Sequence, residues 1–194
     1  DSDPEPQGDV TEFDNIYAMT FAEEESGFFA GVAAALETRT GKVASLTGIA
    51  SPPVVNYQLG FESGVNYANT HLGTNVEVVS LPSSAGTDVT GANVGGNYVG
   101  DFNDPATGKV ISDALIAQDV DIIFMVAGGS GQGAITAALE AGDVMVIGGD
   151  VDQYDDGSYS GGNIVLTSAL KNMAINVERQ LNAIADGTFQ GSNN

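Results

Sequence analysis

The sequence predicts an α/β fold in which helices cover both faces of a doubly wound parallel sheet. Segments with strand patterns alternate with segments of helical spacing along most of the 194 residues. Several strand segments, such as "VDIIFMVA" at 120–127, are apolar on both faces, which is typical of strands buried between two layers of helices. A hydrophobic content of 42% also permits a sizeable core.

The first half of the chain alternates three strand patterns with two helix patterns. Strands are predicted at 15–21, 42–50 and 75–81. The helix at 23–41 begins with acids that suit its dipole and ends at a glycine. Its apolar stripe consists of Phe28, Phe29, Val32, Ala33 and Leu36. Ser51 is a predicted N-cap before prolines that open the second helix. The apolar side of that helix includes Phe61, Val65 and Ala68.

The second half continues the same alternation. Its predicted elements are a helix opened by Pro105 and capped by Asn103 or Asp104, strands at 120–127, 144–149 and 163–168, and helices at 135–142 and 169–186. The core stripe of the last helix is expected to be Leu170, Met173, Ala174, Val177, Leu181 and Ile184. The loop at 82–104 is long and rich in Gly, Ser and Asn, and is expected to hold a small hairpin around "NVGGNYVG" at 93–100.

Composition narrows the classes of partner. The 26 acids and 5 basic residues give a net charge of −21, so nucleic acid is not an expected partner. This excess of acidic over basic residues indicates either a surface adapted to high salt or an acidic surface that binds a cationic partner. The absence of cysteine excludes disulfides and a thiol nucleophile. Residues 1–14 are predicted to be an acidic flexible tail, before which a leader peptide could have been removed.

A glycine turn follows the most apolar strand. In "DIIFMVAGGSGQGAITAALEAGDVMVIGGD" at 121–150, Gly129 and Gly131 precede Ala134 as in the dinucleotide-binding fingerprint, and an acid ends the next strand. This unit is not the first of its kind in the chain, where that fingerprint belongs. The turn therefore has three interpretations: a pyrophosphate site, tight packing without a ligand, or the rim of a pocket for a neutral polar ligand.

Two charged residues lie where strands deliver side chains to a ligand crevice. Asp150 ends one predicted strand, and Lys171 follows another at a helix start, where the dipole disfavours a cation. Lys171 is therefore either partnered by an acid or ligand hydroxyl, or a surface lysine. The acidic stretch after Asp150 does not match a calcium loop, because Asp155 stands where glycine is needed and Gly161 where glutamate is.

An ordered series of motifs resembles the basic membrane protein family, which includes purine-nucleoside receptors. The series is "TFAEEESGFFAGVAAALETRTGKVASLTG", "PVVNYQLGFESGV", "FNDPATGK", "DIIFMVAGGSGQG", "VIGGDVDQ" and "VLTSALK". It covers about residues 15–186. The resemblance implies a type I periplasmic-binding-protein fold, in which two lobes close on a nucleoside, and a role as substrate-binding lipoprotein of an ABC transporter.

The resemblance also implies site residues and partners. The ligand-binding residues carried over are Glu23, Gly128, Gly129, Gly131, Asp150 and Lys171, with Asp150 as the partner of ribose hydroxyls. It implies a nucleoside-like ligand, an ABC transporter permease as partner, no enzymatic activity, no cofactor and no metal. The expected location is the extracellular face of the membrane or the periplasm.

The resemblance further implies that much of a first lobe is missing, so the chain is expected to be a fragment. In that scheme residues 15–41 cross from the first lobe, 42–168 form the second lobe with a Gly-rich insertion at 82–100, and 169–194 return. Met125 and Val126 stand where an aromatic is expected, which leaves the base preference open. The rival hypotheses are a nucleotide- or NAD-dependent enzyme and a fragment without ligand that self-associates into a homo-oligomer.

Overall fold

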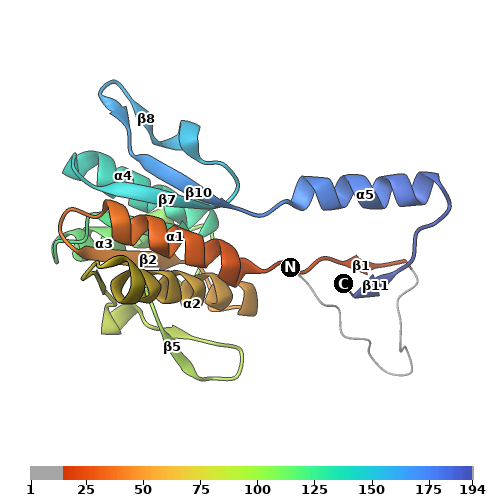
Figure 1. Cartoon of the computed structure of the whole chain (residues 1–194), viewed down its shortest axis with the longest axis horizontal. Helices are drawn as coiled ribbons and strands as arrows, with labels where there is room; N and C mark the ends of the chain where they lie inside the picture. The colour runs from red at the N-terminus through yellow and green to blue at the C-terminus, as the bar shows by residue number, and fades with distance from the viewer. Residues whose placement is uncertain (1–14, 194) are drawn as a thin grey trace. The chain divides into compact units, whose positions relative to one another are not determined.

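The computed structural model describes residues 15–193. They form two compact units, one made of residues 23–170 and one that combines residues 15–22 with residues 171–193. Figure 1 traces both units along the chain. Within the described residues, no helix has the length and apolar character needed to cross a bilayer.

The larger unit is built on a five-stranded sheet with the order β10-β7-β6-β2-β3, in which every neighbouring pair is parallel. Its strands are β2 (Lys42–Thr47), β3 (Glu77–Val78), β6 (Ile122–Val126), β7 (Met145–Asp150) and β10 (Val165–Leu170). Every residue of the central strand β6 is buried, which explains its unbroken apolar sequence. The predicted α/β fold with a doubly wound parallel sheet is confirmed.

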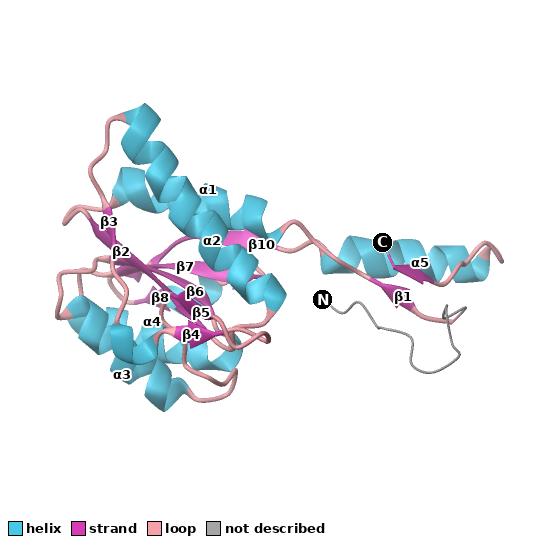
Figure 2. Ribbon diagram, turned by 90° about the horizontal axis from the view of Figure 1, so that it is seen from below, coloured by secondary structure: helices cyan, strands magenta, loops and turns pink. Residues whose placement is uncertain are grey.

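Two helices cover each face of this sheet. Figure 2 shows α1 (Glu23–Glu37) and α2 (Pro52–Tyr67) on one side, and α3 (Pro105–Ile116) and α4 (Gln132–Ala141) on the other. Strand residues alternate between the two layers, as the pleat requires. In β6, Phe124 joins the core under α1 and α2, whereas Met125 joins the core under α3 and α4.

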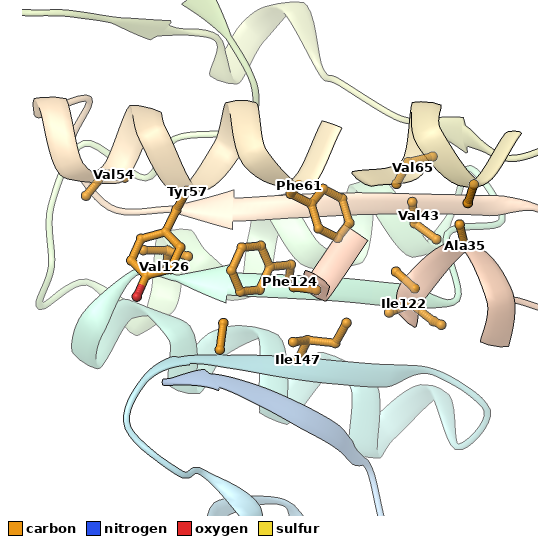
Figure 3. Close-up of a cluster of buried hydrophobic side chains, with 14 of the residues drawn as sticks. Ala35, Val43, Val54, Tyr57, Phe61, Val65, Ile122, Phe124, Val126 and Ile147 are labelled. Carbon is orange, nitrogen blue, oxygen red and sulfur yellow. The ribbon is translucent and has the colours of Figure 1, made fainter. Parts of the chain in front are cut away.

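The core under α2 contains an aromatic group. Figure 3 shows Tyr57 and Phe61 reaching from α2 toward Phe124 of β6. Phe61 stacks on Phe124 with ring centroids 5.3 Å apart, and Tyr57 meets the same ring edge-on at 5.9 Å. The predicted apolar side of this helix is confirmed, because Phe61, Val65 and Ala68 are all buried.

Helices α1 and α2 approach each other through glycines. A methyl group on Gly31 would lie 2.1 Å from the carbonyl oxygen of Phe61, and one on Gly64 would lie 2.1 Å from that of Phe28. The face of α1 that packs on α2 is consequently made of small residues. The apolar stripe predicted for α1 is therefore wrong as a core face: Phe29 is 70% exposed and Leu36 is 53% exposed.

The long glycine-rich segment at 82–104 forms backbone hydrogen bonds with the edge of β2 that the short strand β3 leaves uncovered. It contains a hairpin formed by β4 (Gly86–Thr87) and β5 (Asn93–Gly95), but the turn precedes residue 93, so the hairpin predicted around residues 93–100 was misplaced. Residues 97–100 then run beside the end of β2, where Thr47 N–H donates to Asn97 O at 2.8 Å and Val99 N–H donates to Thr47 O at 2.9 Å. Since this segment occupies the edge of β2, β3 is much shorter than the strand predicted at 75–81.

Several caps and short elements connect these parts. Asp104 accepts a hydrogen bond from Thr107 N–H at 3.0 Å and so caps α3, and Gly142 ends α4 with a φ of 82°, both as predicted. The remaining short elements are the π-helix η1 (Ala68–Leu72), the 3-10 helices η2 (Pro82–Ser84), η3 (Gly128–Gly131) and η4 (Tyr154–Gly157), and the hairpin of β8 (Ser158–Tyr159) and β9 (Gly162–Asn163).

The smaller unit contains β1 (Tyr17–Ala18), which pairs in parallel with β11 (Ser192–Asn193), and α5 (Met173–Ala185). Helix α5 begins later than the predicted 169–186, because β10 continues through Leu170. Lys171 therefore lies in the connection before α5 and not at a helix start. The core stripe predicted for this helix is also wrong here, because no described residue of α5 is buried and Leu181 is 60% exposed.

Candidate ligand-binding site

The carboxyl ends of the parallel strands converge at one edge of the larger unit. Gly48 follows β2, the glycine turn η3 follows β6, and Asp150 ends β7. Registers bring these ends level, since Thr47 pairs with Val126 and Asp150 pairs with Leu170. Ligands of open α/β sheets bind beyond this edge. The positions predicted for a site in this unit are therefore grouped where the fold places ligands.

Asp150 ends its strand in an unusual backbone conformation. Its φ of 66° lies in the left-handed region, which aspartate tolerates better than most residues. Gln153 supports this turn from the loop that follows. Its side-chain oxygen accepts from Gly149 N–H at 3.1 Å, and its own N–H donates to Ser168 Oγ at 3.1 Å. These two bonds tie the "VIGGDVDQ" and "VLTSALK" segments to each other beside Asp150.

A buried tyrosine contacts the Asp150 carboxylate. Tyr57 is 1% exposed, and its hydroxyl donates to Asp150 Oδ1 across 3.4 Å. Burial raises the pKa of Tyr57 well above its ordinary value, and the negative charges of Asp150 and Glu23 raise that pKa further. The tyrosine is thus a protonated donor at neutral pH. Because both carboxylates act on Tyr57, the structure brings two of the predicted site residues together around it.

Glu23 opens α1 and is 3% exposed. At this position the helix dipole favours a carboxylate, which offsets part of the cost of burying it. Tyr57 is a site residue that the sequence reasoning missed. One signal was available, because Tyr57 lies four residues before Phe61 and so belongs to the same buried face of α2.

Another segment of the chain, at Phe102, packs against the glycine turn η3. Phe102 lies over it, so that a methyl group on Gly128 or Gly129 would be 3.2 Å from the Phe102 carbonyl oxygen. The same carbonyl accepts from Ser130 N–H at 3.0 Å. The ring of Phe102 lies against Gly48, where an added methyl group would come within 2.2 Å of it. These glycines therefore allow an aromatic ring to lie at the ends of β2 and β6.

Ser130 holds the loop that carries Phe102 in place through hydrogen bonds. Its side chain is fully buried, donates to Asp101 O at 2.9 Å and accepts from Asp104 N–H at 2.8 Å. The loop that carries Phe102 is thus held between the glycine turn and the start of α3. Phe102 was also missed from the sequence, although "FNDP" places an aromatic directly before a helix cap at this edge of the sheet.

The remaining predicted residues have different surroundings. Gly128 and Gly129 are exposed, whereas Gly131 is buried against Met125. Lys171 belongs to the smaller unit, where its ammonium lies 5.4 Å from the centre of the Phe21 ring. Within residues 15–193, no three His, Asp or Glu side chains gather as a metal site would require. The roles of all six predicted residues in binding remain predictions.

Comparison with known proteins identifies the family. The family model for PnrA-like ABC transporter substrate-binding proteins, Bmp, matches residues 2–87 and 90–194. The chain belongs to the basic membrane protein family. The resemblance drawn from the sequence motifs over about residues 15–186 is therefore confirmed.

Curated proteins with similar sequences include members of the same family. The chain is 31% identical over 189 residues to the ABC transporter nucleoside-binding protein BmpA of Lactococcus lactis, covering 91% of this chain and 48% of that protein. It is 35% identical over 158 residues to basic membrane protein D of Borreliella burgdorferi, covering 81% of this chain and 39% of that protein. The chain thus spans about half the length of the curated relatives it matches.

Solved structures support the fold assignment. An ABC transporter solute-binding protein from Aeropyrum pernix superposes with a TM-score of 0.75 at 27% identity, covering 95% of this chain and 48% of that one. A solute-binding protein from Conexibacter woesei gives a TM-score of 0.63 at 19% identity, covering 94% of this chain and 52% of that one. At that lower identity the match concerns the fold alone. The predicted periplasmic-binding-protein-like architecture is confirmed.

Proposed function

We propose that the larger unit is a ligand-binding lobe of an ABC transporter's substrate-binding component, and that its ligand is a nucleoside. One observation carries the proposal. At the carboxyl edge of a single sheet, the Asp150 carboxylate ends β7, and the Phe102 ring, carried by the loop before α3, lies against Gly48 and Gly128 at the ends of β2 and β6. A nucleoside combines a hydroxyl-bearing ribose with a flat base, and these two kinds of side chain suit those two parts.

The chemistry of each group supports its assigned role. A carboxylate accepts hydrogen bonds at both oxygens, so Asp150 can accept from the adjacent hydroxyls of a ribose. An aromatic ring such as Phe102 offers a face on which a base can stack. Glu23 supplies a second acceptor near the same tyrosine, suited to an N–H group of a base. Gly128 and Gly129, which are exposed at the same edge, complete the contacts proposed within the larger unit, and Gly131, buried against Met125, supports their turn.

The family supports the same conclusion at a coarser level. Its members are substrate-binding proteins of ABC transporters, and the Lactococcus lactis relative is named as nucleoside-binding. By this inference the protein is not an enzyme and needs no cofactor. Its partners are the small-molecule ligand and an ABC transporter permease, which it meets on the extracellular side of the membrane.

The alternative of an NAD-dependent enzyme is less well supported. In a dinucleotide fold the glycine turn faces the pyrophosphate, whose negative charge the helix N-terminus attracts. Here the Phe102 backbone lies against that turn, and its carbonyl takes the N–H of Ser130. The carboxylates of Glu23 and Asp150 nearby would also repel an anion. A neutral ligand is therefore favoured.

Self-association is a second alternative with an observation of its own. Met173, Val177, Leu181 and Ile184 of α5 are all exposed, and exposed apolar faces of this kind promote contacts between chains. Sedimentation in dilute and molar salt checks this alternative. A mass that stays monomeric at both ionic strengths would remove it.

The proposal is tested by a binding screen in molar salt. Isothermal titration would compare adenosine, guanosine, cytidine and uridine with NAD, ribose and glucose. We expect heat of binding for at least one nucleoside and none for the sugars or NAD. Binding of NAD without any nucleoside would favour the enzyme alternative and overturn the proposal.

A further inference from the structure

Tyr57 is held rigidly between a helix and the sheet. Its ring packs edge-on against Phe124, and its backbone carbonyl lies where a methyl group on Gly27 would approach within 2.4 Å. Figure 3 shows its hydroxyl at the end of the apolar cluster, while the rest of the side chain belongs to it. A ring fixed in this way presents one hydroxyl in one place. The group it meets there is Asp150 Oδ1.

Asp150 is also held from its backbone. The left-handed turn at this residue is closed by Val151 N–H, which donates to Gly149 O at 2.8 Å. Gln153 and Ser168 brace the same turn through the two bonds already described. A strained conformation of this kind persists only where surrounding contacts determine it. The backbone bonds therefore fix the turn from which the Asp150 side chain extends, and the tyrosine contact holds its carboxylate.

We propose that Tyr57 is a positioning residue, whose hydroxyl orients the Asp150 carboxylate toward the hydroxyl groups of the ligand. Tyr57 acts through Asp150. A carboxylate has acceptor capacity for several hydrogen bonds, so a bond from Tyr57 is compatible with a bond from the ligand. The inference rests on the proposed function, because it assumes that Asp150 accepts from a sugar hydroxyl.

The inference predicts a particular pattern of losses in the full chain. Tyr57→Phe removes one oxygen and should weaken adenosine binding about tenfold, the loss expected for one such bond. Binding of 2′-deoxyadenosine, which offers fewer hydroxyls, should weaken by less. In an Asp150→Asn background the effect of Tyr57→Phe should fall below about twofold, because the oriented group has already been altered.

The chain offers a matched control in Tyr98. This tyrosine is also buried, burial raises its pKa to about 12, and its hydroxyl donates to Gln58 Oε1 rather than to Asp150. Tyr98→Phe removes the same atom from a comparable environment and should leave adenosine affinity unchanged. Equal losses in both variants would mean that Tyr57 acts only through general stability, and would overturn the proposal.

A second measurement separates this inference from the proposed function. Thermal unfolding of wild type, Tyr57→Phe, Asp150→Asn and the double variant needs no ligand. If the two side chains are coupled, the double variant should lose less in melting temperature than the sum of the single variants. Additive losses would overturn the positioning contact whatever the ligand. If the melting temperatures are non-additive but no nucleoside binds, the proposed function is refuted and the contact between Tyr57 and Asp150 stands.

Discussion

Replacement of Gly31 by alanine tests the close packing of α1 on α2. The added methyl group would lie 2.1 Å from Phe61 O, 2.9 Å from Phe61 C and 3.0 Å from Val65 N. All three atoms belong to the backbone of α2, so no side-chain rotation can relieve the contact. The helices would have to separate, and the Tyr57 and Phe61 side chains that α2 inserts into the core would move with it.

The size of the effect follows from two opposing contributions. Overpacking a well-packed contact costs about 1–3 kcal/mol, and a backbone obstacle belongs at the upper end of that range. Within a helix, alanine is about 1 kcal/mol more favourable than glycine, which offsets part of this cost. We therefore expect the free energy of unfolding to fall by about 2 kcal/mol, which corresponds to roughly 4–8 °C in melting temperature for a chain of this size.

Thermal and urea unfolding at one fixed salt concentration measure this loss. Asn66→Ala is the matched control, because Asn66 is an exposed position of the same helix α2. It should be neutral or slightly stabilising, since alanine favours helix. A Gly31→Ala protein as stable as wild type would refute the conclusion that the glycines are required for this contact.

Three further predictions concern salt, a helix cap and the aromatic ring at the site. With 26 acids against 5 basic residues, the melting temperature should rise from dilute to molar salt, since the screening length falls to about 3 Å at 1 M; a flat or falling curve contradicts a salt-adapted surface. Hydrogen bonds from the Thr107 side chain and backbone lower the pKa of Asp104, so the stabilising effect of its carboxylate is present at neutral pH and is lost as the pH falls through that lowered pKa. Asp104→Ala should therefore lower the melting temperature at pH 7 and much less in acid. A loss of the same size at every pH would show that the ionised carboxylate is not what stabilises the helix end. Gly48→Ala should displace the Phe102 ring and weaken nucleoside binding in titration calorimetry, whereas unchanged affinity would argue against a role for Phe102 in the site.

Much of the fold could be predicted because its signals are local. Strands such as β6 are apolar on both faces, and the caps at Asp104 and Gly142 are set by residues within one turn of the helix end. The buried face of α1 could not be predicted in the same way. Hydrophobicity ranks Phe29 and Leu36 above glycine and alanine, but the glycines of α2 permit a contact that only small residues can fill.

The candidate site was predictable only where chain position determines it. Asp150 was predicted because it ends a strand, and the structure places it at the expected edge of the sheet. Tyr57 and Phe102 reach that edge from a helix and from a loop distant in sequence, through contacts with Asp150 and Gly48 that no periodicity encodes. The start of α5 was misplaced because pairing with β7 extends β10 through Leu170.

The most direct test of the central claim is the affinity of the Asp150→Asn variant for nucleosides in molar salt. The substitution keeps the shape of the side chain but removes the charge of the acceptor. Hydrogen bonds to charged groups contribute about 1.5–3 kcal/mol, so the dissociation constant should rise roughly tenfold to hundredfold by titration calorimetry, with thermal unfolding as the check on folding. A variant that folds and binds nucleosides as tightly as wild type would contradict the role of Asp150, and a wild-type chain that binds NAD but no nucleoside would contradict the account as a whole.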